Sequence, residues 1–583
     1  MSHVLKRLGM CVREFKKPAI LTLAFIVCEA VIETFIPFIT AELVNKIEGG
    51  VDMAEIVKVG VLLIVLALCS LACGALAGMF SSKAGTGFAR NLRHDMFERV
   101  QSFAFENIDK FSSSSLVTRM TTDVNSVQMS FMMLTRIAVR APLMLIFSIT
   151  MAYIMGGALA TSFVVIIPVL AFGLIMIGKK AMPAFRAVFK KYDRMNASIE
   201  ENVRAMRVVK GFSREEYEKE KFAVSSDNIA ADFTKAERIV ACNMPLMQLC
   251  MYFNMVFVLF VGSRIVVQSQ GSLIKVGQIS AMLTYGVQIL MSLMMLSMIY
   301  VMLTMSIEAA KRICEVLDEE PTLHNPASPV TEVKDGSIDF CSVSFKYSAA
   351  AQKYALSDID LHIASGMTVG ILGVTGSSKS TLVQLIPRLY DVTEGAVKVG
   401  GVDVRDYDLE TLREAVAMVL QKNELFSGTI RDNLRWGNPN ATEDDIIEAC
   451  RMAQVHDYIS SFPDGYDKWI EQGGTNVSGG QKQRLCIARA LLKKPKILIL
   501  DDSTSAVDTR TDALIRQSLR DYIPATTKLI IAQRVASVMD ADLILILDNG
   551  QIAARGTHDE LLKTSSIYQE IYSQQTKGGE ENG

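Results

Sequence analysis

The sequence has little charge, and the charge that it has is balanced. Charged residues make up 21% of the 583 residues, hydrophobic residues make up 50%, and the mean hydropathy is +0.27, which is too apolar for a soluble globular protein. Lys and Arg number 60 against 62 Asp and Glu, so the net charge is −2 and no overall positive field would attract a polyanion. The composition predicts a membrane protein and argues against nucleic acid as a partner.

Cysteines with metal-ligand spacing are also lacking. The 10 cysteines are scattered, and most lie in the C-terminal half or in apolar stretches, such as Cys28, Cys69, Cys73 and Cys250. This distribution predicts buried thiols in a reducing compartment and no disulfide framework. The first apolar stretch is too long for a signal peptide and has no small-residue cleavage site, so we expect it to remain in the protein.

What the sequence does contain is six long apolar stretches before about residue 310. They cover 18–44, 57–80, 132–155, 160–177, 245–267 and 279–303, each near the ~20 residues that a helix needs to cross the hydrocarbon core. Lys and Arg gather before the first stretch and within 83–119 and 179–238, while the other three connections hold almost none. The positive-inside rule then places the N-terminus, both long connections and the C-terminal half in the cytoplasm.

The two long connections are expected to be helical, because apolar residues recur there every three or four positions with charges between them. Their turns near 111–116 and 212–217 are expected to contact another domain. Pro321, Pro326 and Pro329 interrupt helix and mark a boundary. The predicted organisation is a membrane domain over 1–317, a linker over 318–336, a soluble domain over 337–575 and a disordered tail over 576–583.

The clearest chemistry follows an apolar, strand-like run, TVGILG. The next residues are Gly373, Val374, Thr375, Gly376, Ser377, Ser378, Lys379, Ser380 and Thr381, and a helical pattern follows them. A strand, a glycine-containing loop and a helix N-terminus together form a cradle for phosphates. Lys379 is expected to contact the β- and γ-phosphates of a nucleotide, and Ser380 to hold Mg²⁺.

Ser378 departs from the phosphate-loop pattern, which has glycine at this position. Serine can serve there if its backbone keeps a negative φ, and nucleotide binding is expected on that condition. A chance turn rich in Gly and Ser is the plainer alternative for the whole run.

A second apolar run, KILIL, ends in Asp501 and Asp502. The carboxyl ends of parallel strands face the ligand crevice, so Asp501 is expected to meet Mg²⁺ through water and Asp502 to face the attacking water. The alternative is a buried strand that ends in a solvated acidic turn.

Between these runs lie Ser478, Gly479, Gly480 and Gln481, followed by a helical pattern, LCIARALLKK. This string resembles the signature of ABC transporter ATPase domains, usually LSGGQ, with Val477 in place of Leu. The order of phosphate loop, signature and carboxylates supports the resemblance. Six spans and one such domain look like an exporter-type half-transporter. The resemblance implies an all-α six-helix membrane domain followed by an α/β P-loop ATPase domain with a helical subdomain, and ATP with Mg²⁺ as cofactors.

The resemblance also assigns roles to three further residues. It implies that Tyr347 stacks on adenine, that Gln421 reaches Mg²⁺ and senses the membrane domain, and that Asp508 lies at a dimer contact. Tyr347 and Gln421 also have a plainer interpretation, since each stands at the end of a predicted strand.

Two departures from the family pattern weaken hydrolysis. Asp502 stands where the family usually has Glu, and a carboxylate about 1 Å out of place can cost ~10²-fold in rate. Gln533 stands where the family usually has His, and Gln cannot act as a protonated donor. In this family ATP is sandwiched between one chain's phosphate loop and the other chain's signature. We therefore predict a heterodimer in which this chain has the degenerate site and completes the partner's competent one.

The membrane domain says less about the cargo. One face of the sixth stretch carries Met291, Met294, Met295, Met298, Met302 and Met305, which suit varied apolar ligands, with helix packing or lipid contact as the alternative. Glu29 and Glu33 share a face of the first stretch and would bind a cationic substrate or pair with an Arg.

The predicted function is ATP-driven efflux of drug-like or lipid-like apolar or amphipathic molecules across a bacterial cytoplasmic membrane. An ATP-gated channel or a sensor subunit that binds nucleotide without pumping is the alternative.

Overall fold

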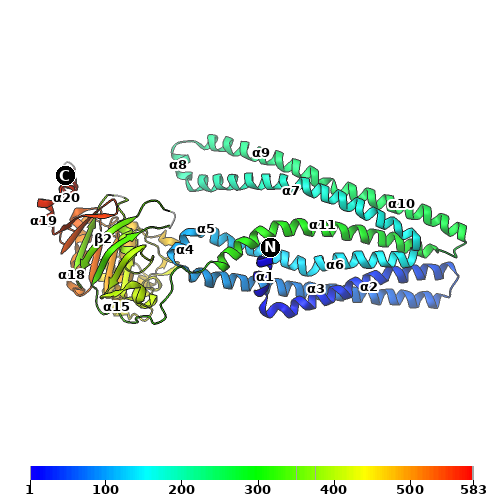
Figure 1. Ribbon diagram of the computed structural model, residues 1–583, viewed down its shortest axis with the longest axis horizontal. Helices are drawn as coiled ribbons and strands as arrows, with labels where there is room; N and C mark the ends of the chain where they lie inside the picture. Colours follow the sequence, from blue (N-terminus) through cyan, green and yellow to red (C-terminus); the bar gives the residue numbers. More distant parts are fainter. Residues whose placement is uncertain (1, 349–350, 375, 581–583) are drawn as a thin grey trace. The chain divides into compact units, whose positions relative to one another are not determined.

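The computed structural model describes residues 2–348, 351–374 and 376–580. The chain divides into two compact units (Figure 1). The first comprises Met1–Gln101 and Ser113–Glu319, and the second comprises Ser102–Ser112 and Glu320–Gly583. The first unit is helical and the second contains three sheets. The predicted order, a helical membrane domain followed by an α/β domain, is confirmed.

Long helices dominate the first unit (Figure 1). Its helices are α1 Ser2–Met10, α2 Lys16–Glu48, α3 Met53–Gln101, α5 Ser113–Thr118, α6 Val124–Gly156, α7 Thr161–Arg204, α8 Met206–Gly211, α9 Glu215–Ala241, α10 Asn243–Ser269 and α11 Val276–Asp318. The six predicted apolar stretches fall on α2, α3, α6, α7, α10 and α11.

Five continuous helical stretches of the described residues are long and apolar enough to cross a membrane. One of them, Ser113–Arg204, has 92 residues and contains both α6 and α7. The chain reverses between these two helices at Gly157, whose φ is +50° (Figure 1), a conformation that glycine adopts without steric cost. Because this one stretch crosses twice, the five stretches correspond to the six predicted spans.

The predicted helical extensions are present. α7 continues to Arg204 and α9 begins at Glu215, and Lys191 of α7 pairs with Asp232 of α9. Polar side chains join the spanning helices: the buried Tyr285 hydroxyl of α11 donates to the Thr34 carbonyl of α2 at 2.8 Å. Such bonds satisfy polar groups that lipid would leave unpaired.

The second unit is built around a six-stranded sheet with the order β12-β11-β3-β10-β9-β6. Its strands are β3 Thr368–Leu372, β6 Val416–Val419, β9 Ile497–Asp501, β10 Thr527–Ile531, β11 Leu543–Asp548 and β12 Gln551–Gly556. Neighbouring strands are parallel except for β12 at the edge. The parallel strands are mostly apolar because both faces of the sheet are covered.

Two smaller sheets and ten helices complete the described part of the second unit. The other strands are β1 Ile338–Phe345, β2 Leu356–Ile363, β4 Glu394–Val399, β5 Val402–Asp403, β7 Gly428–Thr429 and β8 Trp469–Ile470. The helices are α4 Phe105–Lys110, α12 Lys379–Gln384, α13 Leu409–Ala415, α14 Ile430–Arg435, α15 Glu443–Met452, α16 His456–Ser460, α17 Gly479–Leu492, α18 Thr509–Tyr522, α19 His558–Thr564 and α20 Ser566–Glu580. Helices α14 to α17 pack around a shared apolar core, as expected for a helical subdomain.

The segment 102–112 differs from its predicted place in the membrane domain. It belongs to the second unit, where Asp109 of α4 accepts a hydrogen bond from the Tyr390 hydroxyl at 2.7 Å and Asn107 donates to the Glu320 carbonyl at 3.0 Å. The contacting turn is therefore α4, slightly before the predicted 111–116. Local apolar spacing could not reveal this, because both partners lie more than 200 residues further along the chain.

Two other expectations need correction. Helix α20 continues to Glu580 and so includes part of the segment predicted as a disordered tail; residues 581–583 lie outside the described part. All ten cysteines are free thiols, but Cys28, Cys69, Cys242 and Cys341 are exposed on the surface of this single chain and Cys73 is half-buried. Apolar outer faces are what spanning helices present to lipid.

Candidate functional site

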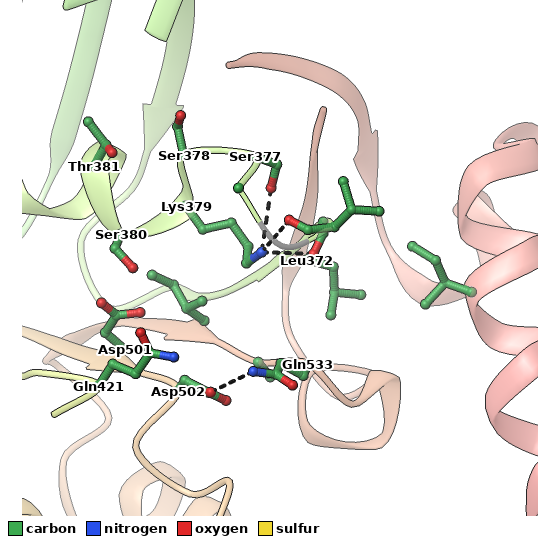
Figure 2. Close-up of a pocket in the computed structure, with 16 residues that line it drawn as sticks. Leu372, Ser377, Ser378, Lys379, Ser380, Thr381, Gln421, Asp501, Asp502 and Gln533 are labelled. Atoms are coloured by element: carbon green, nitrogen blue, oxygen red, sulfur yellow. Dashed lines mark hydrogen bonds between the residues drawn. The ribbon is translucent and has the colours of Figure 1, made fainter. Parts of the chain in front are cut away.

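The predicted phosphate loop opens a cavity of about 720 Å³ at the carboxyl ends of β3, β9 and β10 (Figure 2). The predicted residues that line it are Gly373, Val374, Gly376, Ser377, Ser378, Lys379, Ser380, Thr381, Gln421, Asp501, Asp502 and Gln533. Thr375 lies outside the described residues. Sequence reasoning missed Leu372, Ile531, Ala532 and Ile571, apolar wall residues that no motif marks. The fold thus gathers three separate sequence motifs into one cavity.

Lys379 lies at the centre of the loop. Its Nζ donates to the carbonyl oxygens of Gly373 at 2.8 Å and Val374 at 2.9 Å, and more weakly to Ser377 Oγ at 3.4 Å (Figure 2). Burial lowers the pKa of Lys379, and the nearby carboxylates of Asp501 and Asp502 oppose this. The ammonium is therefore held inside the cavity, on the loop whose N–H groups form the predicted cradle.

The backbone at Ser378 does not meet the condition of a negative φ. Its φ is +68° and its ψ is +26°, which is the left-handed conformation. This conformation brings Cβ too close to the following carbonyl oxygen, at roughly 1–2 kcal/mol for an L-residue. The glycine of the family pattern is therefore required by the turn itself, and Ser378 holds the same turn under strain.

We expect Ser378→Gly to stabilise the nucleotide-free protein. The relief of steric strain exceeds the extra unfolded-state entropy of glycine, so the unfolding free energy should rise by about 0.5–1 kcal/mol. Thermal unfolding of the full chain in detergent measures this. Ser377→Gly is the matched control and should lower stability, because the backbone of Ser377 does not have a positive φ and its hydroxyl contacts Lys379. An equal loss in both variants would contradict the strain account.

Ser380, Gln421 and Asp501 could hold a divalent cation. Asp501 ends β9 and is 3% exposed; burial raises its pKa, and a hydrogen bond from Ser380 opposes the rise. The three side chains offer hydroxyl, amide and carboxylate oxygens to one cavity, and these hard donors suit Mg²⁺. The donor set therefore fits the predicted metal.

Asp502 and Gln533 contact each other. Gln533 Nε2 donates to Asp502 Oδ2 at 2.8 Å (Figure 2). Burial raises the pKa of Asp502, whereas hydrogen bonds from Gln421 and Gln533 lower it. Asp502 also has a positive φ of +48°. Asp502 is expected to face the attacking water, but one of its two carboxylate oxygens therefore already accepts a hydrogen bond from the Gln533 amide.

Tyr347 lies beside the loop helix and outside the set of residues that line the cavity. Its hydroxyl is 2.8 Å from Thr381 Oγ1, and its ring packs edge-on against Tyr390 and Phe345. The ring is 45% exposed, so it retains free surface. Stacking on adenine remains a prediction.

The signature residues form a helix cap outside this cavity. Ser478 Oγ accepts from the Gln481 N–H at 3.3 Å, and Gln481 Oε1 accepts from the Ser478 N–H at 2.8 Å, which is a capping box at the start of α17. A Cβ on Gly480 would lie 2.8 Å from the Ala506 carbonyl oxygen, so only glycine fits there. Asp508 likewise caps α18 by accepting from the Thr511 N–H at 2.9 Å.

The membrane-domain carboxylates are paired with arginine, one of the two predicted alternatives. Arg140 of α6 lies 2.6 Å from Glu33 and 3.6 Å from Glu29 of α2. Paired charges cost less at membrane depth than isolated ones. This pairing leaves less negative charge to attract a cationic substrate.

The methionine face of α11 is partly open in the single chain. Met291, Met295 and Met298 are exposed, whereas Met294 and Met302 are half-buried. The side chain of Met305 lies outside the described part. An exposed face fits cargo, lipid or partner contact equally.

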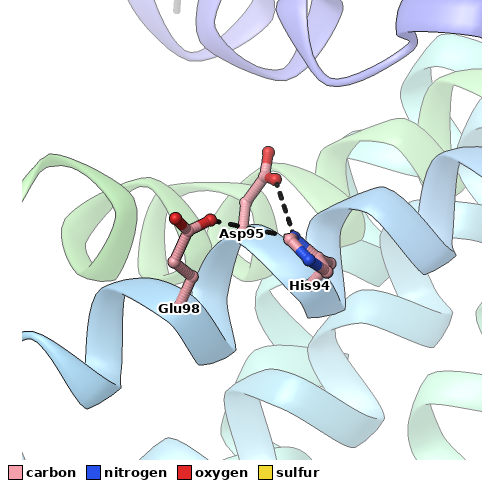
Figure 3. A group of neighbouring side chains, drawn as sticks. All are labelled: His94, Asp95 and Glu98. Carbon is pink, nitrogen blue, oxygen red and sulfur yellow. Dashed lines mark ion pairs between the residues drawn. The ribbon is translucent and has the colours of Figure 1, made fainter.

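A small acidic group on α3 was not singled out in the sequence. His94 Nδ1 lies 3.7 Å from Asp95 and 3.8 Å from Glu98 (Figure 3). Asp95 already pairs with Arg13 at 2.9 Å, and His94 and Glu98 are exposed. These contacts are those of a surface ion-pair network.

Comparison with known proteins agrees with the two-unit structure. Residues 19–307 match the family described as ABC transporter transmembrane region, and residues 356–505 match the family described as ABC transporter. The ABC transporter ATP-binding protein YfiB of Bacillus subtilis is 35% identical over 95% of this chain and 96% of its own length. A fatty acid ABC transporter ATP-binding/permease protein of Mycobacterium bovis is 32% identical over 90% of this chain and 83% of its own.

A solved structure supports the same assignment. A bacterial Atm1-family ABC exporter with ATP bound superposes with a TM-score of 0.83 at 25% identity, covering 96% of this chain and 99% of that one. The chain therefore belongs to the ABC transporter family, as an exporter half-transporter: a multi-pass membrane protein that joins a transmembrane domain to an ATP-binding ATPase domain and needs a dimer partner for ATP-driven export.

Proposed function

We propose that this chain is the degenerate-site half of a heterodimeric exporter, with its N-terminus and ATPase domain in the cytoplasm of a bacterial cell. The observation that carries this proposal is the Asp502–Gln533 contact at 2.8 Å. A general base must have a free oxygen within reach of the proton that it takes. Asp502 is one methylene shorter than the usual Glu and gives an oxygen to the Gln533 amide, so this site binds ATP and hydrolyses it slowly.

Nucleotide binding itself is retained. Lys379 and the loop N–H groups take the phosphates, and Ser380, Gln421 and Asp501 take Mg²⁺, which neutralises charge on the β- and γ-oxygens when bound. Tyr347 supports the adenine. Lys379 is held by the loop itself, through Gly373, Val374 and Ser377, and of these groups only Gln421 bonds to Asp502. ATP therefore stays bound at this site through many cycles of the other.

The signature serves the partner's site. The capping box fixes Ser478 to Gln481 at the positive end of α17, where backbone N–H groups favour an anion. Asp508 caps α18 close by in the chain and completes the dimer surface. Closure of the two ATPase domains brings this helix end to the partner's γ-phosphate.

Closure is conveyed to the membrane helices through the cytoplasmic turns. Segment 102–112 is bound to the ATPase domain through Asp109 and Tyr390, so α3 is pulled when that domain moves. The turn at 212–217 has the same role toward a second ATPase domain.

The cargo is an apolar or amphipathic molecule. Arg140 pairs with Glu33 and lies near Glu29, which leaves less charge to attract a cation, and the open methionine face adapts to varied apolar shapes. One relative is named as a fatty acid transporter, and a fatty acid is an amphipathic molecule of this kind.

The chain purified without its partner should hydrolyse ATP slowly. A turnover far below the ~10 s⁻¹ of an ordinary enzyme, with stoichiometric binding of labelled ATP, is the expected result. A turnover near ~10 s⁻¹ would contradict the degenerate site. Dye transport into inverted vesicles that contain both subunits separates the two alternatives. A pump accumulates the dye when ATP is added, whereas a channel only equalises the dye concentrations on the two sides.

A further inference from the structure

A second cleft lies in the ATPase domain, at the opposite end of the sheet from the nucleotide cavity. It has a volume of about 180 Å³ and is bordered by α18, by the amino ends of β3 and β10, and by residues 537–542. Lys528 on β10 pairs with Thr368 on β3, whereas the nucleotide cavity begins at Ile531 of the same strand. The two clefts share no lining residue among those described.

Lys528 is the unusual residue of this cleft. It is 3% exposed, and the other four residues of its strand, Thr527–Ile531, are buried as well. Within the described residues its ammonium has no hydrogen bond or salt bridge, although it lines the cleft. The side chain is buried and its ammonium borders the cleft. Burial lowers the pKa of Lys528, while attraction to Asp542 opposes this.

The acidic residues of the cleft already contact other groups that line it. Asp540 lies 2.8 Å from Arg516 and 3.6 Å from Arg520. Asp542 Oδ2 accepts from the Thr368 N–H at 2.7 Å. Arg520 is more than half exposed, and its remaining N–H groups are free to take another acceptor. The cleft therefore has more donors than acceptors, with cationic groups on two of its walls.

We propose that this cleft binds a phosphate-like oxyanion between Lys528 and Arg520. A tetrahedral oxyanion has enough acceptor atoms for both cations, and charge-assisted bonds of this kind are the strong ones. The space is far larger than the ~10–15 Å³ that one water needs. The anion supplies Lys528 with its missing partner, and the site is independent of the ATP cavity and of the proposed heterodimer.

Lysine labelling tests the site on the unmodified full chain. A non-hydrolysable ATP analogue blocks the Lys379 loop, and reductive methylation of each lysine is followed by peptide mass spectrometry, with phosphate or chloride at equal ionic strength. If the Kd is ~2 mM, then ~10 mM phosphate should slow labelling of Lys528 about sixfold. Lys493 is the control, because it is half-buried and its ammonium already donates to the Arg413 and Val416 carbonyls, so its rate should not change.

A variant gives the second measurement. Lys528→Met keeps length and apolar packing, and it should abolish the phosphate-dependent rise in melting temperature seen with the loop blocked. Stronger protection by glycerol phosphate than by phosphate would identify the phosphate group of a metabolite as the ligand, and the reverse the free ion. Equal Lys528 labelling in phosphate and chloride, or an unchanged phosphate effect in Lys528→Met, would overturn the proposal.

Discussion

Gly479→Asp in this chain should nearly abolish ATP hydrolysis and transport by the proposed heterodimer. The new carboxylate stands in the first turn of α17, where we expect the partner's bound γ-phosphate. At ~4 Å and an effective dielectric near 20, one unit charge repels another by about 4 kcal/mol, which reduces productive closure nearly a thousandfold. The chain itself should fold, because a Cβ at Gly479 meets only Ala506 Cβ at 3.5 Å and an acidic residue suits a helix N-terminus.

Asp502→Asn should have a much smaller effect on the same complex. It removes a carboxylate that is already tied to Gln533, so steady-state turnover should fall only modestly, while the time for which ATP stays occluded at this site changes. ATPase rate and dye transport of both variants in the assembled heterodimer measure this asymmetry.

Gly479→Asn separates charge from size. It has nearly the volume of the Asp variant without its charge, so it should retain most of the activity. Near-complete loss in Asp502→Asn would mean that Asp502 is a working base. Full activity in Gly479→Asp would mean that this signature contacts no hydrolysing site.

The large elements of this chain could be predicted because each rests on a local pattern. A run of ~20 apolar residues spans a membrane wherever it occurs, and the six stretches fall on six long helices. A strand followed by a glycine-containing loop and a helix predicts a phosphate cradle, and its residues line one cavity with Asp501 and Gln533. These features depend on spacing along the chain.

The features that escaped prediction depend on contacts between distant segments or on a single backbone angle. Asp109 and Tyr390 are 281 residues apart, and no local pattern joins them. The positive φ of Ser378 is imposed by the loop on a residue that would avoid it. Lys528 gives no signal as one polar residue in an apolar strand, because only the fold shows that its neighbours leave it without a partner.

Restoring the usual family residues at Asp502 and Gln533 should create activity at this chain's own site, if the site is degenerate as proposed. Asp502→Glu moves the carboxylate outward by one methylene. Gln533→His removes the amide that donates a hydrogen bond to this carboxylate and supplies a ring that can be protonated. Correct placement of a catalytic group is worth ~10²-fold, so the turnover of the double variant, purified without the partner, should exceed that of the parent by about this factor. Gln533 is exposed on its loop, which leaves room for the imidazole.

Each single variant should gain less than the double variant, since a placed base and a γ-phosphate donor act on the same step. Adding Lys379→Ala to the double variant should remove the gain, because the activity must arise at this chain's own phosphate loop. The measurement is steady-state ATP hydrolysis of the purified chain at equal ATP occupancy. A double variant that binds ATP as the parent does and shows no gain would mean that Asp502 and Gln533 do not limit hydrolysis, and that the slow step lies in assembling the two-chain site.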